Sequence, residues 1–207
     1  MIEIEQPSWK SIGWRDKAAD VSDEQIKFWR EETDKYNKEI VPMLMEEFQF
    51  KNRLEVPKLV KIVINMGVGR AKENKKILED AVRHLSVVAC QKPKITKARK
   101  DIAGFKLRKG DAVGCKVTLR NKKAYEFMDR LISIVLPRIK DFRGLPSGSF
   151  DGRGGYTMGI SELAVFPEIS IDDIEFVQGM DITFVVSTKS DEQSYGMLKL
   201  FGMPFRT

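Results

Sequence analysis

Residues 58–66, KLVKIVINM, decide the fold of this chain. Branched apolar residues dominate this stretch, and Pro57 and Gly67 bound it, which is typical of a strand buried against a core. Residues 74–89, NKKILEDAVRHLSVVA, follow, and their apolar side chains recur at the spacing of an amphipathic helix. A strand followed by a helix with one apolar face predicts a helix packed on a sheet.

The chain beyond this unit continues to alternate. Asn121 is expected to cap a second amphipathic helix that runs to Pro137, and a capping-box pattern at 190–193 is expected to open a terminal helix that ends near Gly202. Further extended segments are expected at residues 94–96, 104–108, 112–120, 161–166, 174–177 and 181–188, with a turn at 109–111. Strands mixed with helices that need to cover only one face predict an α+β sandwich whose other sheet face is free.

Two stretches differ in composition from the rest. Residues 143–160 hold six glycines and are expected to form a long surface loop, mobile between Gly144 and Gly155 in the free protein. Residues 1–34 carry nine acidic and five basic side chains and all three tryptophans. We therefore predict a partly helical acidic extension, residues 1–34, followed by a single domain, residues 35–207. The tryptophans either pack on that domain or anchor a partner protein.

Positive charge is concentrated in one part of the chain. The net charge is +6, but residues 92–123 hold twelve basic and two acidic side chains, net +10, which leaves −4 for all other residues. A solvated charged face is one interpretation. A polyanion partner is the other, and the concentration favours it because each neutralised phosphate releases a condensed counterion.

The motifs of most other classes are missing from the sequence. No apolar run approaches the roughly 18 residues that a membrane helix needs, so we expect no membrane association and a cytoplasmic location. Cys90 and Cys115 lie outside any C-x-x-C pattern and are expected to be reduced, buried packing residues with no metal site. The glycine pattern after Met66 lacks its third glycine, and the single histidine, His84, has no nucleophile pattern beside it. We therefore expect no cofactor and no enzymatic activity.

Nine blocks, in order from about residue 35 to the C-terminus, carry a resemblance to a known family. They are KIVINMGVG (61–69), QKPKITKA (91–98), IAGFKLRKG (102–110), VGCKVTLR (113–120), YEFMDRLISIVLPRIKDFRGL (125–145), SFDGRGGYTMGI (149–160), FPEI (166–169), GMDITFV (179–185) and KLFGMPF (199–205). Together they closely resemble the bacterial-type large-ribosomal-subunit protein five family, the 5S-rRNA-binding ribosomal proteins of the central protuberance.

The resemblance implies an open antiparallel sheet with helices packed on one face, and RNA bound to the other face and loops. It implies a structural constituent of the cytoplasmic large subunit that binds 5S rRNA and 23S rRNA beside other central-protuberance proteins. It also implies contact with P-site tRNA and a bridge to small-subunit head protein thirteen. The residues implied for 5S rRNA are Asn65, Gln91, Lys94, Thr96, Lys116, Thr118 and Arg120. Those implied for the tRNA loop are Lys100, Ala103, Gly104, Phe105, Lys106 and Arg108.

Two details of this interpretation stay open. The resemblance leads us to expect serine where this chain has Asp101, whose charge should weaken the positive field of the tRNA loop. The alternatives in function are an RNA-modifying enzyme, which would need a catalytic group or cofactor loop, and an assembly or regulatory factor that recruits a protein through residues 1–34.

Overall fold

The computed structural model describes residues 36–72, 75–170, 174, 176–188 and 190–206. Within them, five strands form one sheet in the order β2-β3-β1-β5-β4, and every neighbouring pair is antiparallel. The strands are β1 (Leu59–Gly67), β2 (Lys94–Lys97), β3 (Ala112–Arg120), β4 (Tyr156–Ile160) and β5 (Met180–Val186). The fold is therefore α+β with an open antiparallel sheet, as predicted. The predicted extension and its tryptophans lie outside the described residues.

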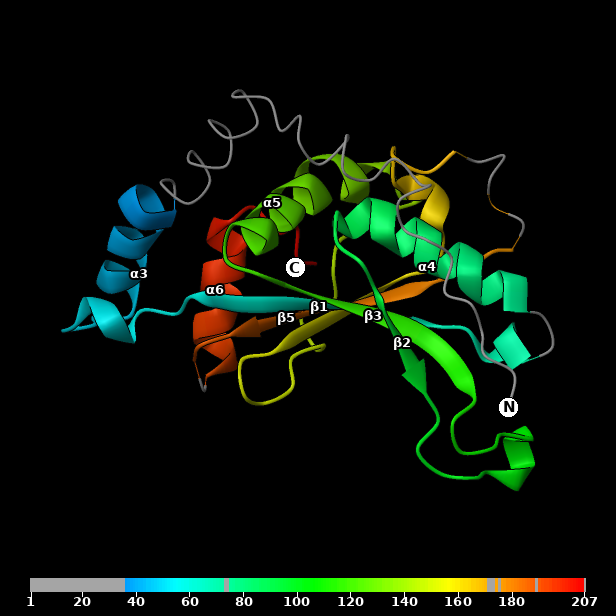
Figure 1. Cartoon of the computed structure of the whole chain (residues 1–207). Coiled ribbons are helices and arrows are strands. Elements are labelled where there is room, and N and C mark those ends of the chain that lie inside the picture. The colour runs from blue at the N-terminus through cyan, green and yellow to red at the C-terminus, as the bar shows by residue number, and fades with distance from the viewer. Residues whose placement is uncertain (1–35, 73–74, 171–173, 175, 189, 207) are drawn as a thin grey trace.

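Helices pack on one side of this sheet. They are α3 (Val41–Glu47), α4 (Lys75–Ala89), α5 (Lys122–Arg130) and α6 (Asp191–Leu200). A π-helical turn, Tyr36–Ile40, leads into α3, and α5 continues through a second one, Leu131–Val135, into a 3₁₀ turn that ends at Arg138. Figure 1 shows α4 and α5 above the sheet, whereas the connection between β2 and β3 projects from the opposite side.

Alternation along the strands decides which face is covered. In β1, Ile62, Ile64 and Met66 are fully buried, whereas Lys61 and Asn65, on alternate positions, are half-buried. Because successive side chains point to opposite faces, one face of β1 joins the core and the other does not. The central strands β3 and β5 alternate in the same way. One face of the sheet is thus left uncovered within the described part of the chain.

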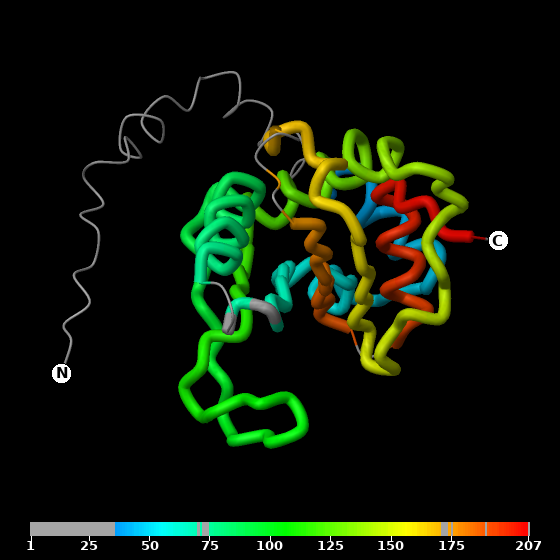
Figure 2. Tube along the Cα trace, turned by 90° about the vertical axis from the view of Figure 1, so that its right-hand side faces the viewer, coloured from blue at the N-terminus to red at the C-terminus, as the bar shows by residue number. Residues whose placement is uncertain are grey.

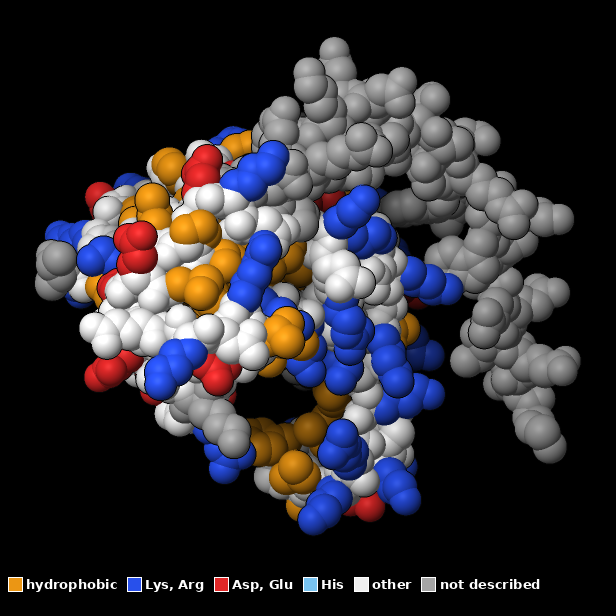
Figure 3. All heavy atoms as spheres, turned by 90° about the vertical axis from the view of Figure 1, so that its left-hand side faces the viewer, with side chains coloured by type: hydrophobic (Ala, Val, Ile, Leu, Met, Phe, Trp, Pro, Cys, Tyr) orange, Lys and Arg blue, Asp and Glu red, His pale blue; other side chains and the backbone are white. Residues whose placement is uncertain are grey.

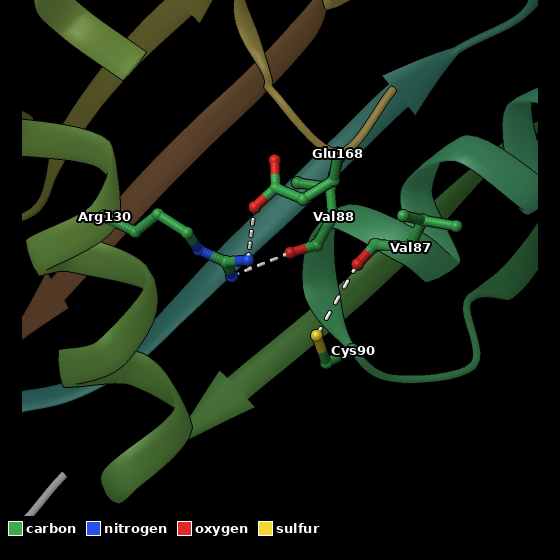
Figure 4. A network of polar contacts seen from close by, with 5 residues as sticks. All are labelled: Val87, Val88, Cys90, Arg130 and Glu168. Carbon is green, nitrogen blue, oxygen red and sulfur yellow. Dashed lines mark hydrogen bonds and ion pairs between the residues drawn. The ribbon is translucent and has the colours of Figure 1, made fainter. Parts of the chain in front are cut away.

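A charged cluster ties the helical layer together (Figure 4). The Arg130 guanidinium, on α5, donates through Nη1 to Glu168 Oε1 over 2.6 Å and through Nη2 to the Val88 carbonyl over 3.0 Å. The second bond satisfies a carbonyl at the C-terminus of α4, where helical carbonyls have no partner within the helix. Arg130 therefore joins α4, α5 and the FPEI segment over the same face.

Three expectations about the chain between residues 156 and 177 are wrong. Residues 161–166 contain a 3₁₀ turn, Leu163–Val165, and the described residues among 174–177 form no strand. Leu163 and Phe166 are buried in the core, so the apolar spacing there reflects a packed turn. Conversely, residues 156–160, predicted as loop, form β4, in which Gly159 lies opposite Asp181.

The rest of the glycine-rich stretch is held by carboxylates. Asp191, the first residue of α6, accepts hydrogen bonds from the backbone N–H groups of Gly152 (3.0 Å) and Gly154 (2.7 Å). Asp151 accepts from Arg153 and Gly155, both over 2.8 Å, and these bonds lower the pKa of Asp151. Gly152 and Gly154 have positive φ, which suits glycine. The loop is expected from sequence to be mobile, but this network favours an ordered loop.

Both predicted helix caps form differently. Asn121 has φ +53°, and its side chain makes no capping bond to α5. Ser190 also makes no side-chain cap; instead the Thr188 hydroxyl accepts from the Ser190 N–H and bonds to Gln193. The helices begin where expected, although other contacts position their first turns.

The cysteine expectation is half correct. Both cysteines are free thiols, and Cys115 is fully buried, which raises its pKa to about 11. Cys90 is exposed just beyond α4, where its thiol points to the Val87 carbonyl (Figure 4).

Candidate RNA-binding surface

The uncovered face gathers most of the residues predicted to bind RNA. Strand register places Lys116 opposite Asn65 on one side and opposite Lys94 on the other. Thr118 and Arg120 follow Lys116 at two-residue intervals along β3, and Thr96 follows Lys94 along β2. Residues two apart in a strand share a face, so all six lie on the uncovered side. We call this the basic face and add Lys61, which lies opposite Arg120.

Gln91 is the one predicted 5S rRNA residue that lies off the strands. It precedes β2, and its Nε2 donates to the Thr118 carbonyl over 3.3 Å. β2 pairs with β3 only between Ala112 and Lys116, so Gln91 bonds the next stretch of β3 beyond the end of β2. Its side chain therefore lies beside the basic face, with its amide nitrogen bound to protein.

The basic face is electrostatically one-sided. Lys61, Lys94, Lys116 and Arg120 all lie on β1, β2 and β3. On β5 the residue opposite Asn65 is Asp181. Farther along, Thr183 and Thr157 share a hydroxyl hydrogen bond of 3.1 Å. An anion is therefore attracted to the β2-β3-β1 half and not to the β5-β4 half.

Sequence reasoning missed Lys61 as a candidate. It precedes Asn65 by four residues in the same strand, so the two-residue period of a strand places Lys61 on the same face as Asn65. The sequence alone could therefore have placed Lys61 on this face. It could not have placed Lys61 opposite Arg120, because the register between β1 and β3 depends on the turns and the core.

The predicted tRNA-contacting residues lie together in the projecting loop, residues 98–111. Figure 2 shows this loop reaching beyond the rest of the described chain, and Figure 3 shows Lys and Arg side chains along one side of the molecule and around the loop tip. Lys100, Ala103, Gly104, Phe105, Lys106 and Arg108 are all exposed. The Phe105 side chain is 75% exposed, and a Cβ added to Gly104 would meet nothing within 4 Å.

The loop has its own scaffold of backbone hydrogen bonds. Ile102 and Leu107 exchange N–H···O bonds of 3.0 and 3.1 Å, and between them Ala103–Phe105 form a 3₁₀ turn. Lys106 closes this turn with φ +51° and donates to the Ala103 carbonyl. The extended segment expected at 104–108 is therefore wrong, because the chain reverses direction here.

Two acidic side chains brace this scaffold. Asp101 Oδ1 accepts from the Lys109 N–H over 2.7 Å, and Asp111 Oδ2 accepts from the Arg108 N–H over 2.9 Å. Each carboxylate thus binds a backbone N–H group of the loop, in addition to reducing the positive charge of the neighbouring cations. Asp101, expected to weaken the field, thus also has a structural contact.

A separate hollow of about 830 Å³ lies where α3, α6 and residues 147–150 meet. Phe48, Phe150 and Tyr195 line it together with charged side chains, among them Asp191. The Asp191 carboxylate already accepts two backbone bonds, which leaves it poorly suited to act as an acid or base. Nothing in this hollow favours the enzymatic alternative.

Neither a membrane span nor a metal cluster occurs in the described part of the chain. Among those residues, no helix is both long and apolar enough to cross a bilayer. The same residues bring no three His, Cys, Asp or Glu side chains together as a metal site. His84 is buried on α4, away from the basic face.

Comparison with known proteins assigns the family. The family described as "Ribosomal protein L5" matches residues 52–108, and the C-terminal domain of the same ribosomal family matches residues 112–205. The large ribosomal subunit protein uL5 of Clostridium tetani is 56% identical over 172 residues, covering 83% of this chain and 96% of the relative. That of Geotalea uraniireducens is 56% identical over 171 residues, with the same coverage. This chain therefore belongs to the ribosomal protein L5 family.

Proposed function

We propose that this chain is a structural constituent of the large ribosomal subunit that binds 5S rRNA through the basic face. Membership of the ribosomal protein L5 family supports the ribosomal role. The observation that carries the RNA site is the register that places Asn65, Lys116 and Lys94 side by side. Neighbouring strands lie about 4.8 Å apart, so two adjacent ammonium groups and one amide form a row across β2, β3 and β1.

The basic face has the chemistry that structured RNA requires. Lysine and arginine meet phosphates, while Asn65, Thr96 and Thr118 offer neutral hydrogen-bonding groups for 2′-hydroxyls and base edges. The face lies on paired strands, so the backbone that carries its groups is positioned before RNA arrives. Preorganisation of this kind lowers the entropy cost of binding.

The projecting loop contacts P-site tRNA in this proposal. Its exposed cations, Lys100, Lys106 and Arg108, neutralise phosphates, and Gly104 allows the RNA backbone to approach closely. Phe105 offers a ring for stacking on an accessible base. The loop projects away from the sheet, which separates its exposed side chains from the basic face (Figure 2).

The proposal extends to the partners that the family resemblance implies. The chain also contacts 23S rRNA in the central protuberance and bridges to small-subunit head protein thirteen, beside other central-protuberance proteins. It acts in the cytoplasm, as part of the particle, without catalysis. Residues 35–207 form the RNA-binding domain, and residues 1–34 are an addition to it.

A salt series tests the proposal. Binding of 5S rRNA to the purified chain is measured between low and moderate salt, with an unrelated structured RNA of equal length as competitor. We expect tight binding that resists the competitor, with log affinity falling by roughly 0.7 to 0.9 per log salt for each phosphate neutralised. Weak binding shared equally with the competitor would show a general polyanion surface and contradict the assignment.

A further inference from the structure

We infer that the acidic extension, residues 1–34, docks on the basic face of its own chain when RNA is absent. The inference concerns the same surface as the proposed function, but it names a second occupant. Three observations carry it: complementary charge and chemistry, the point where the extension joins the domain, and its length.

Charge complementarity is the first observation. The extension is net −4, with nine acidic and five basic side chains, and residues 92–123 are net +10. The basic and acidic residues of the rest of the chain cancel in sum. The net negative excess therefore lies in the extension, and the net positive excess lies in residues 92–123. Their attraction is strong at low salt and falls as salt shortens the screening length.

The chemistry of the extension also matches that of an RNA ligand. Its carboxylates offer the anionic oxygens that phosphates would offer, and Trp9, Trp14 and Trp29 offer flat rings in place of bases. Exposed apolar side chains that could receive them lie in the adjoining projecting loop, where Ile102 is 45% exposed and Phe105 75%. Exposed apolar groups beside lysines suit an acidic, aromatic segment better than a purely acidic one.

The point of attachment lies at one end of the sheet. Tyr36, the first described residue, donates its hydroxyl to the Pro57 carbonyl over 2.7 Å, just before β1 begins. Lys61 and Arg120 lie opposite one another near this same end of the sheet. Tyr36 is buried against Tyr125 of α5 and Phe201, so it lies in the helical layer. The extension therefore joins the domain at the Lys61–Arg120 end of the sheet, and in this proposal it passes around that edge to the basic face.

The extension is long enough to follow the whole face. From Arg120 to Ala112, β3 spans roughly 30 Å at about 3.4 Å per residue. A chain of 34 residues reaches roughly 110 Å when extended. Tethering at one end gives an effective concentration in the millimolar range, so even weak contacts keep such a segment bound for part of the time.

The consequence is a filter on RNA binding. RNA must displace a docked extension, so docking lowers the apparent affinity for every RNA that binds the face. Only an RNA that gains specific contacts offsets the free energy of this displacement. The factor is the same for every RNA that binds the face, so weak, charge-driven binding to unrelated RNA is the first to fall below significant occupancy. Both family matches begin after residue 51, so the extension is no part of the matched family core.

Carbodiimide cross-linking of the full chain tests docking directly. The reagent joins carboxylates to nearby lysines, and mass spectrometry identifies the pairs. We expect links from the extension to concentrate on Lys61, Lys94 and Lys116, and not on Lys140 and Lys199, which are exposed but lie off the basic face. Equal linking to both sets, or no links to the face at low salt, would overturn the inference.

Adding 5S rRNA to the same reaction separates this inference from the proposed function. Loss of the face links on adding 5S rRNA supports both. Persistence of those links supports docking and contradicts the 5S rRNA assignment. A link pattern that never favoured the face overturns docking and leaves the RNA assignment to the salt series.

A pair of full-chain variants with the same net charge tests the filter. One changes Asp16, Asp20, Asp23 and Glu24 of the extension to Asn or Gln. The control changes Glu39, Glu46, Glu55 and Glu79, which are exposed acids of the domain, to Gln. We expect the first variant to bind unrelated RNA about threefold or more tightly than the parent chain, and the control to change less than about twofold. Equal gains would show that only net charge acts, and would overturn the filter.

Discussion

The basic face and the projecting loop carry cations from the same stretch of sequence, but the chain holds them in different ways. On the face, pairing with β1 and β2 fixes Lys116 through backbone ladders on both sides. In the loop, a few backbone bonds within residues 98–111 and two carboxylates hold the cations in place, without a ladder to a neighbouring strand. We therefore expect the stability of the face to change little when a side chain is lost and to fall when its backbone is disturbed. The loop should instead be sensitive to the loss of a side chain and tolerant of a change at a backbone position such as Gly104.

The largest expected effect contrasts one glycine from each region. A Cβ added to Gly114, on β3, would lie 2.4 Å from the Met66 carbonyl oxygen of the neighbouring strand. Backbone cannot move aside within a ladder, so Gly114→Ala should lower the free energy of unfolding by about 1–3 kcal/mol. Gly104→Ala, in the loop, meets open space and should change it by less than about 0.5 kcal/mol. Urea unfolding followed by circular dichroism measures both, and equal losses would contradict the contrast.

The second prediction concerns binding through the face. Arg120→Ala should weaken 5S rRNA binding by about 1–3 kcal/mol, because a charge-assisted contact to RNA is lost. Stability should change little, since the Arg120 side chain is exposed and the ladder remains. Arg138→Ala removes an exposed cation beyond α5 and serves as the control. A folded Arg120→Ala protein with parental affinity would remove this residue from the site.

Comparison of these regions also shows what sequence alone can predict. Much of the face was predictable because strands have a two-residue period: VGCKVTLR alternates, so Lys116, Thr118 and Arg120 fall on one side, and the same period places Asn65 away from Ile62, Ile64 and Met66. Helix α4 followed from apolar spacing in the same way. The membership of Asn65, Lys116, Thr118 and Arg120 in one face needed little tertiary information.

The failures lie where a local rule competes with a long-range one. Residues 156–160 form a strand because β5 pairs with them, although the glycines around them favour a loop. Residues 161–166 have strand-like spacing, but Leu163 and Phe166 are buried from a 3₁₀ turn. The carboxylates of Asp101 and Asp191 bind backbone groups 8 and 37 to 39 residues away, contacts that no spacing rule indicates.

The third prediction tests whether the two regions serve different RNAs. Reversing charge in the loop, with Lys106→Glu and Arg108→Glu together, should leave 5S rRNA affinity unchanged within about twofold. The same change should reduce P-site tRNA occupancy of assembled ribosomes, because two phosphate contacts become repulsive. Arg138→Glu with Lys140→Glu changes net charge equally at exposed positions outside the loop and is the control. Loss of 5S rRNA binding would show that the loop belongs to the 5S rRNA site instead.

The smallest expected effect distinguishes two roles of Asp101. Its carboxylate places a negative charge among the loop cations, yet its Oδ1 accepts the Lys109 N–H over 2.7 Å. Asp101→Asn removes the charge and keeps an acceptor, whereas Asp101→Ala removes both. If the hydrogen bond matters, Asp101→Ala should speed exchange of the Lys109 amide by an amount equivalent to about 0.5–1.5 kcal/mol, with global stability unchanged.

The two Asp101 variants should also part in tRNA binding. Asp101→Asn should strengthen it, because the loop keeps its shape and gains one unit of net positive charge. Asp101→Ala gains the same charge but loses the contact that holds Lys109 beside its neighbours, so its benefit should be smaller. Identical tRNA binding by both variants, with equal amide exchange, would mean that backbone bonds alone shape the loop. That result would contradict the proposed difference between the loop and the basic face, because backbone hydrogen bonds alone would then hold both regions.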